Sequence, residues 1–428
     1  MNVAIIGGGY AGMAAAVTLA ERGIAATVFE AAPQLGGRAR RVVFNDTALD
    51  NGAHILIGAY RETLRLIRLV NRDAGSALLR LPLDWHIQGH FRLRAAPLPA
   101  PLHLALGLLT AGGAGLRERM AAVGFMRSIR KDNFRLQHDV SVSELLQRNR
   151  QGAALTRHLW QPLCIAALNT PPDIASAQVF LNVLRDSLDS TRADSEIMLS
   201  RVDLSALFPD PAADYMRSRG GEVMLGATVE HIRDRDGVYE FTARGTDYRF
   251  THVICAVAPH QLLPAIAGLP TLASTAEQVA RFEYQPIYTI YLQYPGHVAL
   301  PSPMPGMAGG LAQWVFDREA VCGQRGLVAV VISADGPHRH MTQEEIAQRI
   351  HAELEQGFGP LSAPLWQRVI AEKRATFACT VNLRRPSQQT PLKNFHLAGD
   401  YTASDYPATL EAAVRSGITC ARQVLESI

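Results

Sequence analysis

Three glycines near the start of the chain, Gly7, Gly9 and Gly12, have the spacing of a phosphate-binding turn. A short apolar run before them predicts a buried strand, and an alanine-rich pattern over 13–22 predicts a helix after them. Bare backbone at such a turn lets a pyrophosphate approach closely, and the free N–H groups at the helix start attract negative charge. A second predicted strand, Ala26–Glu30, ends in an acid that can bind a ribose hydroxyl. Together these features predict a dinucleotide-binding unit.

Two further segments carry residues suited to the same ligand. Gly37 and the glycine before it offer a second stretch of bare backbone, and the guanidinium of Arg38 suits phosphate oxygens. Near the end of the chain, a predicted strand ends in Gly399-Asp400, and a predicted helix starts at Ala408. The acid can take a ribityl or ribose hydroxyl, and the helix start can face an electron-poor ring. These segments favour a long, extended cofactor of the flavin type.

The elements that must position these groups alternate in blocks. Residues 76–209 read as helices separated by proline and glycine, with an apolar run at 159–172 suited to lining a pocket. Alternating apolar residues then predict strands between 220 and 258, and further strands at Tyr284–Gln293 and Leu327–Ser333. We therefore predict a mixed α/β fold, in which a Rossmann-like FAD-binding domain is interleaved with a substrate-binding domain of a sheet plus helices. The predicted boundaries are 1–75, 210–280 and 380–428 for the FAD-binding domain, and 76–209 and 281–379 for the substrate-binding domain.

Composition limits the possible partners and location. The chain has 428 residues and a net charge of +3, from 42 basic and 39 acidic residues, which does not favour nucleic acid as a partner. Its five cysteines are odd in number and widely spaced, so we expect reduced thiols rather than disulfides or a metal site. A predicted strand at residue 2 leaves no room for a signal peptide. We expect a cytoplasmic protein without a bound metal.

One stretch qualifies this picture of a soluble protein. Residues 95–116 contain no Asp, Glu, Lys or Arg, but prolines and glycines interrupt the run and disfavour a spanning helix. A buried helix is one interpretation. The other is a segment that guards an apolar tunnel or lies on a membrane face, with the arginines that follow it available to lipid phosphates. On that second interpretation, residues 95–130 make peripheral contact with the inner face of the cytoplasmic membrane.

The glycine turn, Glu30, Gly37-Arg38 and Gly399-Asp400 together resemble the FAD-dependent amine oxidase and carotenoid desaturase superfamily. Three segments are more specifically similar to the hydroxysqualene dehydroxylase family, whose members act in bacterial hopanoid synthesis. They are 49–63, 372–377 and 397–417. The resemblance implies FAD as the cofactor and assigns its contacts residue by residue. The implied FAD-binding residues are Gly7, Gly9, Ala11, Gly12, Glu30, Gly37, Arg38, Gly52, Ala53, His54, Val229, Gly399, Asp400, Ala408, Thr409 and Leu410.

The resemblance also implies an activity, the reductive removal of the hydroxyl of hydroxysqualene to give squalene. An apolar isoprenoid would be the substrate, and an electron donor that the sequence does not identify would reduce the FAD. His54 is our candidate proton donor, because imidazole titrates near working pH and the motif places it beside the flavin. The alternative is a histidine that only hydrogen-bonds backbone. Weaker candidates for the donor are Tyr60, Asp50, Tyr401 and Asp405.

Other functions stay open at this point. An isoprenoid or carotenoid desaturase would share the fold and the apolar substrate, with electrons flowing in the opposite direction. An amine oxidase is disfavoured, because Thr409 stands where those enzymes usually place an aromatic wall of the amine site. A lipid-binding relative without redox chemistry would not need Gly399-Asp400, and a plain NAD dehydrogenase would not explain Gly37-Arg38.

Overall fold

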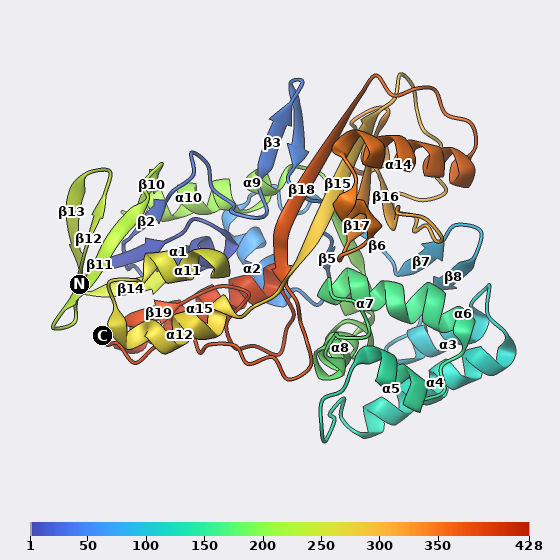
Figure 1. Ribbon diagram of the computed structural model, residues 1–428, viewed down its shortest axis with the longest axis horizontal. Helices are drawn as coiled ribbons and strands as arrows, with labels where there is room; N and C mark the ends of the chain where they lie inside the picture. Colours follow the sequence, from blue (N-terminus) through green and yellow to red (C-terminus); the bar gives the residue numbers. More distant parts are fainter. Residues whose placement is uncertain (1, 428) are drawn as a thin grey trace.

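The computed structural model describes residues 2–427 and contains a five-stranded parallel sheet with the order β10-β2-β1-β14-β19 (Figure 1). Its strands come from three separate parts of the chain, and the predicted strand Ala26–Glu30 has the predicted bounds. The fold is mixed α/β, as expected, and the domain boundaries stay a prediction. The strands of this sheet are β1 (Val3–Ile6), β2 (Ala26–Glu30), β10 (Glu222–Leu225), β14 (His252–Cys255) and β19 (Phe395–Leu397).

Helix α1 (Tyr10–Glu21) follows β1, and eleven of its twelve residues are buried, because neighbours cover it on several sides. It starts three residues earlier than the sequence predicts, since Gly9 is already its N-cap. Helix α15 (Leu410–Glu426) packs along it, and a side chain at Gly417 would overlap the carbonyl group of Ala11. This close approach ties the two ends of the chain together beside the parallel sheet.

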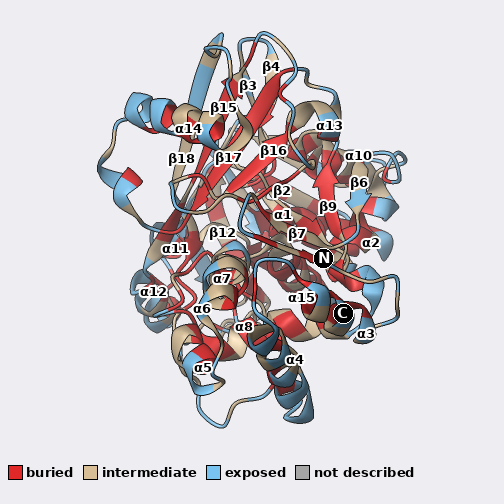
Figure 2. Cartoon of the chain, turned by 90° about the vertical axis from the view of Figure 1, so that its right-hand side faces the viewer, coloured by how far each residue is buried: buried red, intermediate tan, exposed pale blue. Residues whose placement is uncertain are grey.

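The second large sheet is antiparallel, with the order β16-β17-β15-β18. It comprises β15 (Tyr284–Gln293), β16 (Trp314–Asp317), β17 (Leu327–Ser333) and β18 (Trp366–Phe377). Strand β17 is buried on both faces, and its residues alternate between two apolar clusters. One face packs under α14 (Gln343–Phe358), and the other turns toward the main core. Figure 2 shows β16 and β17 as buried, whereas β18 is largely half-buried or exposed.

The expectation that residues 76–209 are helical is only partly right. Four short strands lie in this region, among them β6 (Leu78–Leu81), which pairs with β9 (Ile197–Ser200), and the hairpin β7 (Asp84–Ile87) and β8 (Phe91–Arg94). Each has four residues, and β6 finds its partner more than a hundred residues away, so no local period reveals the pairing. The helices between 95 and 190 include α3 (Leu102–Thr110), α4 (Leu116–Lys131), α5 (Val142–Arg148), α6 (Ala153–Leu155), α7 (Gln161–Leu168) and α8 (Ala177–Leu184).

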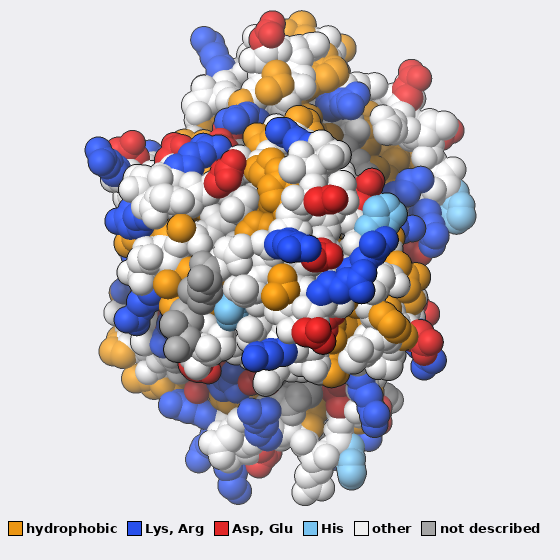
Figure 3. Space-filling model, turned by 90° about the vertical axis from the view of Figure 1, so that its left-hand side faces the viewer, with side chains coloured by type: hydrophobic (Ala, Val, Ile, Leu, Met, Phe, Trp, Pro, Cys, Tyr) orange, Lys and Arg blue, Asp and Glu red, His pale blue; other side chains and the backbone are white. Residues whose placement is uncertain are grey.

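The remaining elements connect and cover the two large sheets. A three-stranded antiparallel sheet, β11-β12-β13, lies at the left of Figure 1, and positive and negative side chains are interspersed on the face seen in Figure 3. These elements are β3 (Arg41–Phe44), β4 (Thr47–Asp50), β5 (Leu56–Ile57), α2 (Arg61–Val70), α9 (Leu204–Leu207), α10 (Pro209–Arg217), β11 (Val229–Arg235), β12 (Val238–Ala243), β13 (Thr246–Phe250), α11 (Pro259–Ala265), α12 (Ala273–Ala280) and α13 (Arg318–Cys322).

The apolar stretch at 95–116 forms the short helix α3 and leads into α4. Leu104 and Leu108 of α3 are buried, whereas Leu102 and Leu106 are exposed. Among residues 2–427, no helix combines the length and the apolar character needed to cross a bilayer.

Candidate functional site

A cavity of about 1180 Å³ starts at the carboxyl ends of β1, β2 and β14 and reaches the inner face of the antiparallel sheet. This edge of a parallel sheet is where ligands bind in open α/β folds. Every FAD-binding residue implied by the sequence lines the cavity except Gly12. A Cβ at Gly12 would overlap the carbonyl oxygen of Gly7, so this glycine allows α1 to pack against β1.

The glycine turn leaves bare backbone at the phosphate end of the cavity. Gly7 has φ +107°, and a Cβ there would lie 2.7 Å from the carbonyl oxygen of Ala256. A Cβ at Gly37 would lie 3.3 Å from the Cα of Gly9, so the two glycine segments approach each other without side chains between them. Gly9 caps α1 with no side-chain hydrogen bond, which leaves the N–H groups of the first turn for an anion. These features fit the pyrophosphate of FAD.

Glu30 is held at the end of β2 by two backbone groups. Its Oε2 accepts the N–H of Gly8 at 2.6 Å, and its Oε1 accepts the N–H of Ala32 at 2.8 Å. Each carboxylate oxygen has a further acceptor site, so the side chain can still receive hydrogen bonds from ribose hydroxyls. The geometry is compatible with the ribose role that the sequence implies.

Arg38 and Asp400 lie 362 positions apart in sequence and form a short ion pair in the cavity wall. Arg38 Nη2 lies 2.6 Å from Asp400 Oδ1, and Arg38 Nη1 donates to the carbonyl oxygen of Ala375 at 2.7 Å. The guanidinium therefore joins both FAD motifs to β18 of the antiparallel sheet. An arginine so placed has N–H groups left for phosphate oxygens, and the carboxylate has acceptor sites left for ribityl hydroxyls.

His54 lines the cavity between these motifs. Burial lowers its pKa to about 4, and the positive charge of Arg38 acts in the same direction. The ring is therefore neutral at working pH, and a neutral ring can act as a hydrogen-bonding group. To act as a cationic acid, His54 would need a negatively charged neighbour that raises its pKa. Its role as proton donor stays a prediction.

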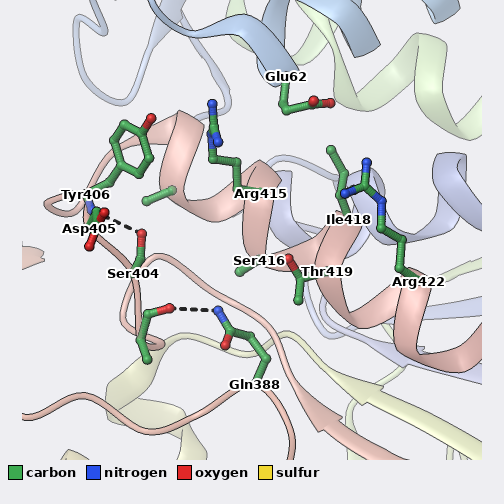
Figure 4. Close-up of a pocket in the computed structure, with 12 residues that line it drawn as sticks. Glu62, Gln388, Ser404, Asp405, Tyr406, Arg415, Ser416, Ile418, Thr419 and Arg422 are labelled. Carbon is green, nitrogen blue, oxygen red and sulfur yellow. Dashed lines mark hydrogen bonds between the residues drawn. The ribbon is translucent and has the colours of Figure 1, made fainter. Parts of the chain in front are cut away.

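The weaker donor candidates lie in different places. Tyr60 lines the large cavity, and burial raises the pKa of its phenol. Asp50 and Tyr401 are buried and are not among the lining residues. Asp405 lines a separate cavity of about 290 Å³ on the outer side of α15, where Figure 4 shows it beside Ser404 and Tyr406.

The far part of the cavity has a mainly apolar wall. Two residues of the run 159–172, Ala166 and Ala167, contribute to it, as the sequence suggested, and the antiparallel sheet supplies aromatic and aliphatic side chains. Three small polar residues, Asn169, Ser333 and Thr376, interrupt the wall, and the acidic Glu372 of β18 also lines the cavity. The apolar side chains from the sheet are Ile287, Trp314, Phe316 and Val331. An apolar pocket with few polar groups suits a hydrocarbon ligand that carries one polar substituent.

Sequence reasoning did not assign the segment after β14 to the site. Residues 256–258 pass over Gly7, and His260, Gln261, Pro264 and Ala265 follow along the cavity wall. The available signal was topological, because a buried parallel strand beside β1 must also end at the ligand edge of the sheet. That signal requires the strand order, which the sequence does not display.

The fold and the glycine cradle define a flavin-binding oxidoreductase. Residues 10–425 match the family model described as "Flavin containing amine oxidoreductase", and the chain belongs to this family. It is an FAD-dependent enzyme.

Named relatives span nearly the whole chain. A hydroxysqualene dehydroxylase of Rhodopseudomonas palustris is 29% identical over 99% of this chain and 98% of its own length. A zeta-carotene desaturase of Zea mays is 23% identical over 97% of this chain and 82% of its own length. Among solved structures, cyclohexylamine oxidase from Brevibacterium oxydans superposes with a TM-score of 0.73 and 19% identity, over 100% of this chain and 99% of its own. That likeness concerns the fold alone.

Proposed function

We propose that this enzyme removes the hydroxyl of hydroxysqualene reductively and releases squalene and water. The observation that carries the proposal is the single cavity, which runs from the glycine cradle to an apolar wall with few polar groups. The relatives named hydroxysqualene dehydroxylase, which match almost end to end, support the same reaction. An external electron donor reduces the cofactor.

When bound and reduced, FAD supplies the hydride that replaces the leaving hydroxyl. The chain's own residues hold and orient the reactants. The bare backbone at Gly9 and Gly37 and the charges of Arg38 and Asp400 hold the cofactor, and the apolar wall excludes water from the carbon that receives the hydride. The leaving hydroxyl departs as water and needs one proton, for which His54 is the candidate donor. Its ring can hydrogen-bond the hydroxyl while neutral. Because burial and the charge of Arg38 lower its pKa, it would need an anionic neighbour to carry the proton at the working pH.

The test is anaerobic incubation of the FAD-loaded enzyme with hydroxysqualene and a chemical reductant. Squalene should form in proportion to the reductant consumed. If no squalene forms and the oxidised enzyme introduces double bonds into an isoprenoid, the reaction is desaturation, which the similarity to zeta-carotene desaturases favours as the second candidate. Retention of near-full activity by His54→Ala, with FAD bound, would remove the assignment of His54 as donor.

We also propose peripheral contact with the cytoplasmic face of a membrane through α3 and the start of α4. Leu102, Leu106, Leu116 and Met120 are exposed there, and the exposed Arg117 lies among them on α4. Exposed apolar side chains beside arginines suit the boundary between acyl chains and anionic headgroups.

Flotation with anionic lipid vesicles tests this contact. The wild-type protein should float with the vesicles, and Leu116→Glu should reduce the bound fraction, because a charge replaces a leucine that is 68% exposed. Leu365→Glu is the matched control, since Leu365 is 67% exposed but lies directly before β18 of the antiparallel sheet, away from α3 and α4 in sequence. Equal flotation of both variants, or none for the wild type, contradicts the proposal.

A further inference from the structure

Two of the polar residues in the apolar part of the cavity, Asn169 and Thr376, are joined by a hydrogen bond. Asn169 follows α7 with left-handed backbone angles, φ +45° and ψ +40°, and is 5% exposed. Its side chain hydrogen-bonds to β15, to β18 and to Ala334, the residue directly after β17. Left-handed geometry is uncommon outside glycine, although asparagine adopts it more readily than most residues.

The neighbours of the Asn169 amide fix its orientation. The backbone N–H of Ala334 can only donate, so the atom that faces it at 2.7 Å must be Oδ1. The NH₂ group must then face the Thr376 hydroxyl at 2.9 Å, with the carbonyl oxygens of Gln285 and Pro286 at 3.4 Å. The two carbonyls can only accept, which agrees with this orientation.

The orientation of Asn169 determines what the Thr376 hydroxyl can do. Because Thr376 Oγ1 accepts a hydrogen bond from the amide, its own proton must point elsewhere. Thr376 lines the cavity, and among residues 2–427 no protein group accepts that proton. The hydroxyl therefore offers one donor to the cavity, and Ser333 lies on the same wall.

A bulge in β18 places this donor beside the cofactor residues. Gln285 of β15 pairs with Thr376 and Ile287 pairs with Glu372, so three residues of β18 face the single residue Pro286. The bulged segment turns the carbonyl of Ala375 to Arg38, at 2.7 Å from Nη1. Bulges of this kind re-aim side chains next to active sites. Thr376 is thus adjacent in sequence to the residue that contacts the FAD-binding arginine.

We propose that Thr376 donates a hydrogen bond to the oxygen of the substrate hydroxyl, and that Asn169 is the positioning residue that turns this donor into the cavity. The inference rests on the proposed function and names the group that recognises the substituent to be removed. In a mainly apolar wall, an oriented donor favours the hydroxylated substrate over the hydrocarbon product. It thereby sets which carbon of a long, flexible chain stops at the cofactor.

The experiment compares equilibrium binding of hydroxysqualene and squalene to the oxidised, FAD-loaded enzyme, followed by perturbation of the flavin spectrum, together with steady-state kinetics. Thr376→Val keeps the shape and removes the hydroxyl. It should weaken hydroxysqualene binding and raise its KM by about tenfold, with kcat and squalene binding nearly unchanged. Thr376→Ser should restore most of the preference. Asn169→Asp presents only acceptors to Thr376 and so draws the threonine hydroxyl proton away from the cavity. This variant should show the same selective loss of hydroxysqualene binding. The double variant should lose no more than either single variant, because both substitutions remove the same hydrogen bond.

Thr289→Val is the matched control. Thr289 lies in β15 of the same sheet and is fully buried, and its hydroxyl has no hydrogen-bond partner among residues 2–427. It does not line the cavity, so its substitution should leave the binding of both ligands unaffected. Unchanged discrimination in Thr376→Val, or equal loss for squalene and hydroxysqualene, overturns the inference. If the wild-type enzyme forms no squalene at all, the proposed function has failed. If the wild-type enzyme forms squalene and Thr376→Val discriminates between the two ligands as the wild type does, only the role of Thr376 is refuted.

Discussion

Asp50 lies at the end of β4, where the first β-hairpin meets the antiparallel sheet, and its ionisation should set a measurable pH dependence. The side chain is buried, its Oδ1 accepts the N–H of Leu204 at 2.8 Å, and Oδ2 is 4.0 Å from Arg318 Nη1. Burial raises its pKa from 3.8 to about 6, although the Leu204 bond and Arg318 oppose the change. The folded state therefore binds this proton more tightly than the unfolded chain does.

The direction and size of the effect follow from that difference. The contribution of the protonated carboxyl to stability is complete below about pH 4 and is lost as the pH rises through about 6. The gap between 3.8 and about 6 corresponds to roughly 3 kcal/mol, at about 1.4 kcal/mol per pKa unit. Asp50→Asn carries no charge at any pH, and its side-chain oxygen can still accept the Leu204 N–H. The variant should lack this loss.

Thermal unfolding with saturating FAD, from about pH 4.5 to about pH 8, measures the effect as the Tm of Asp50→Asn minus that of the wild type. The difference should rise with pH, because only the wild type must bury a carboxylate. Exposed Asp132, treated in the same way, should give a constant difference. A difference that stays flat for Asp50→Asn, or falls with pH, would show that the folded protein accommodates the carboxylate without cost.

Two further substitutions test how the cofactor residues are held. Gly12→Ala should lower both Tm and FAD affinity, because the new Cβ would overlap the carbonyl of Gly7; Gly124→Ala, on an open face of α4, should instead raise stability by up to about 1 kcal/mol. FAD retention by Gly12→Ala at wild-type affinity would contradict this. Glu411→Gln should lower the free energy of unfolding by about 1–3 kcal/mol and should weaken FAD binding. The fully buried carboxylate accepts hydrogen bonds from Thr63 N and Oγ1 at 2.9 and 2.7 Å, and it anchors the start of α15. Urea titrations and flavin fluorescence on dilution measure both effects, and unchanged values would show that α15 does not depend on this carboxylate.

The phosphate end of the site was predictable because backbone geometry restricts the residue type. Gly7, at φ +107°, admits few residues besides glycine, so the turn is visible as letters in the sequence. Strands β15 and β17 were also predictable to the residue, because each is rich in β-branched or aromatic residues. In both cases a local structural requirement restricts the residue types, and that restriction is visible in a short window of sequence.

The features that the sequence did not predict leave no recognisable pattern in any short window of sequence. Strand β6 has four residues and pairs with β9 across the helical region, so the pairing depends on contacts that no window of sequence contains. Asn169 was noted only as part of an apolar run, although its two hydrogen-bonding ends contact β15, β18 and Ala334, the residue directly after β17. A fully satisfied buried amide and an ordinary helix end look alike in the sequence.

Arg38 and Ala375 are far apart in sequence but contact each other, so neither part of the chain alone indicates the whole site. Arg38 belongs to the glycine segment that follows β2, whereas Ala375 belongs to a bulge in the antiparallel sheet, 337 positions later. A register shift of β18 by one residue would turn Thr376 away from the cavity and leave the arginine without this carbonyl. One local irregularity therefore positions both the carbonyl that contacts Arg38 and the side chain of Thr376. If Thr376 has the role proposed above, the bulge, rather than the glycine motif, determines which polar group would meet the substrate.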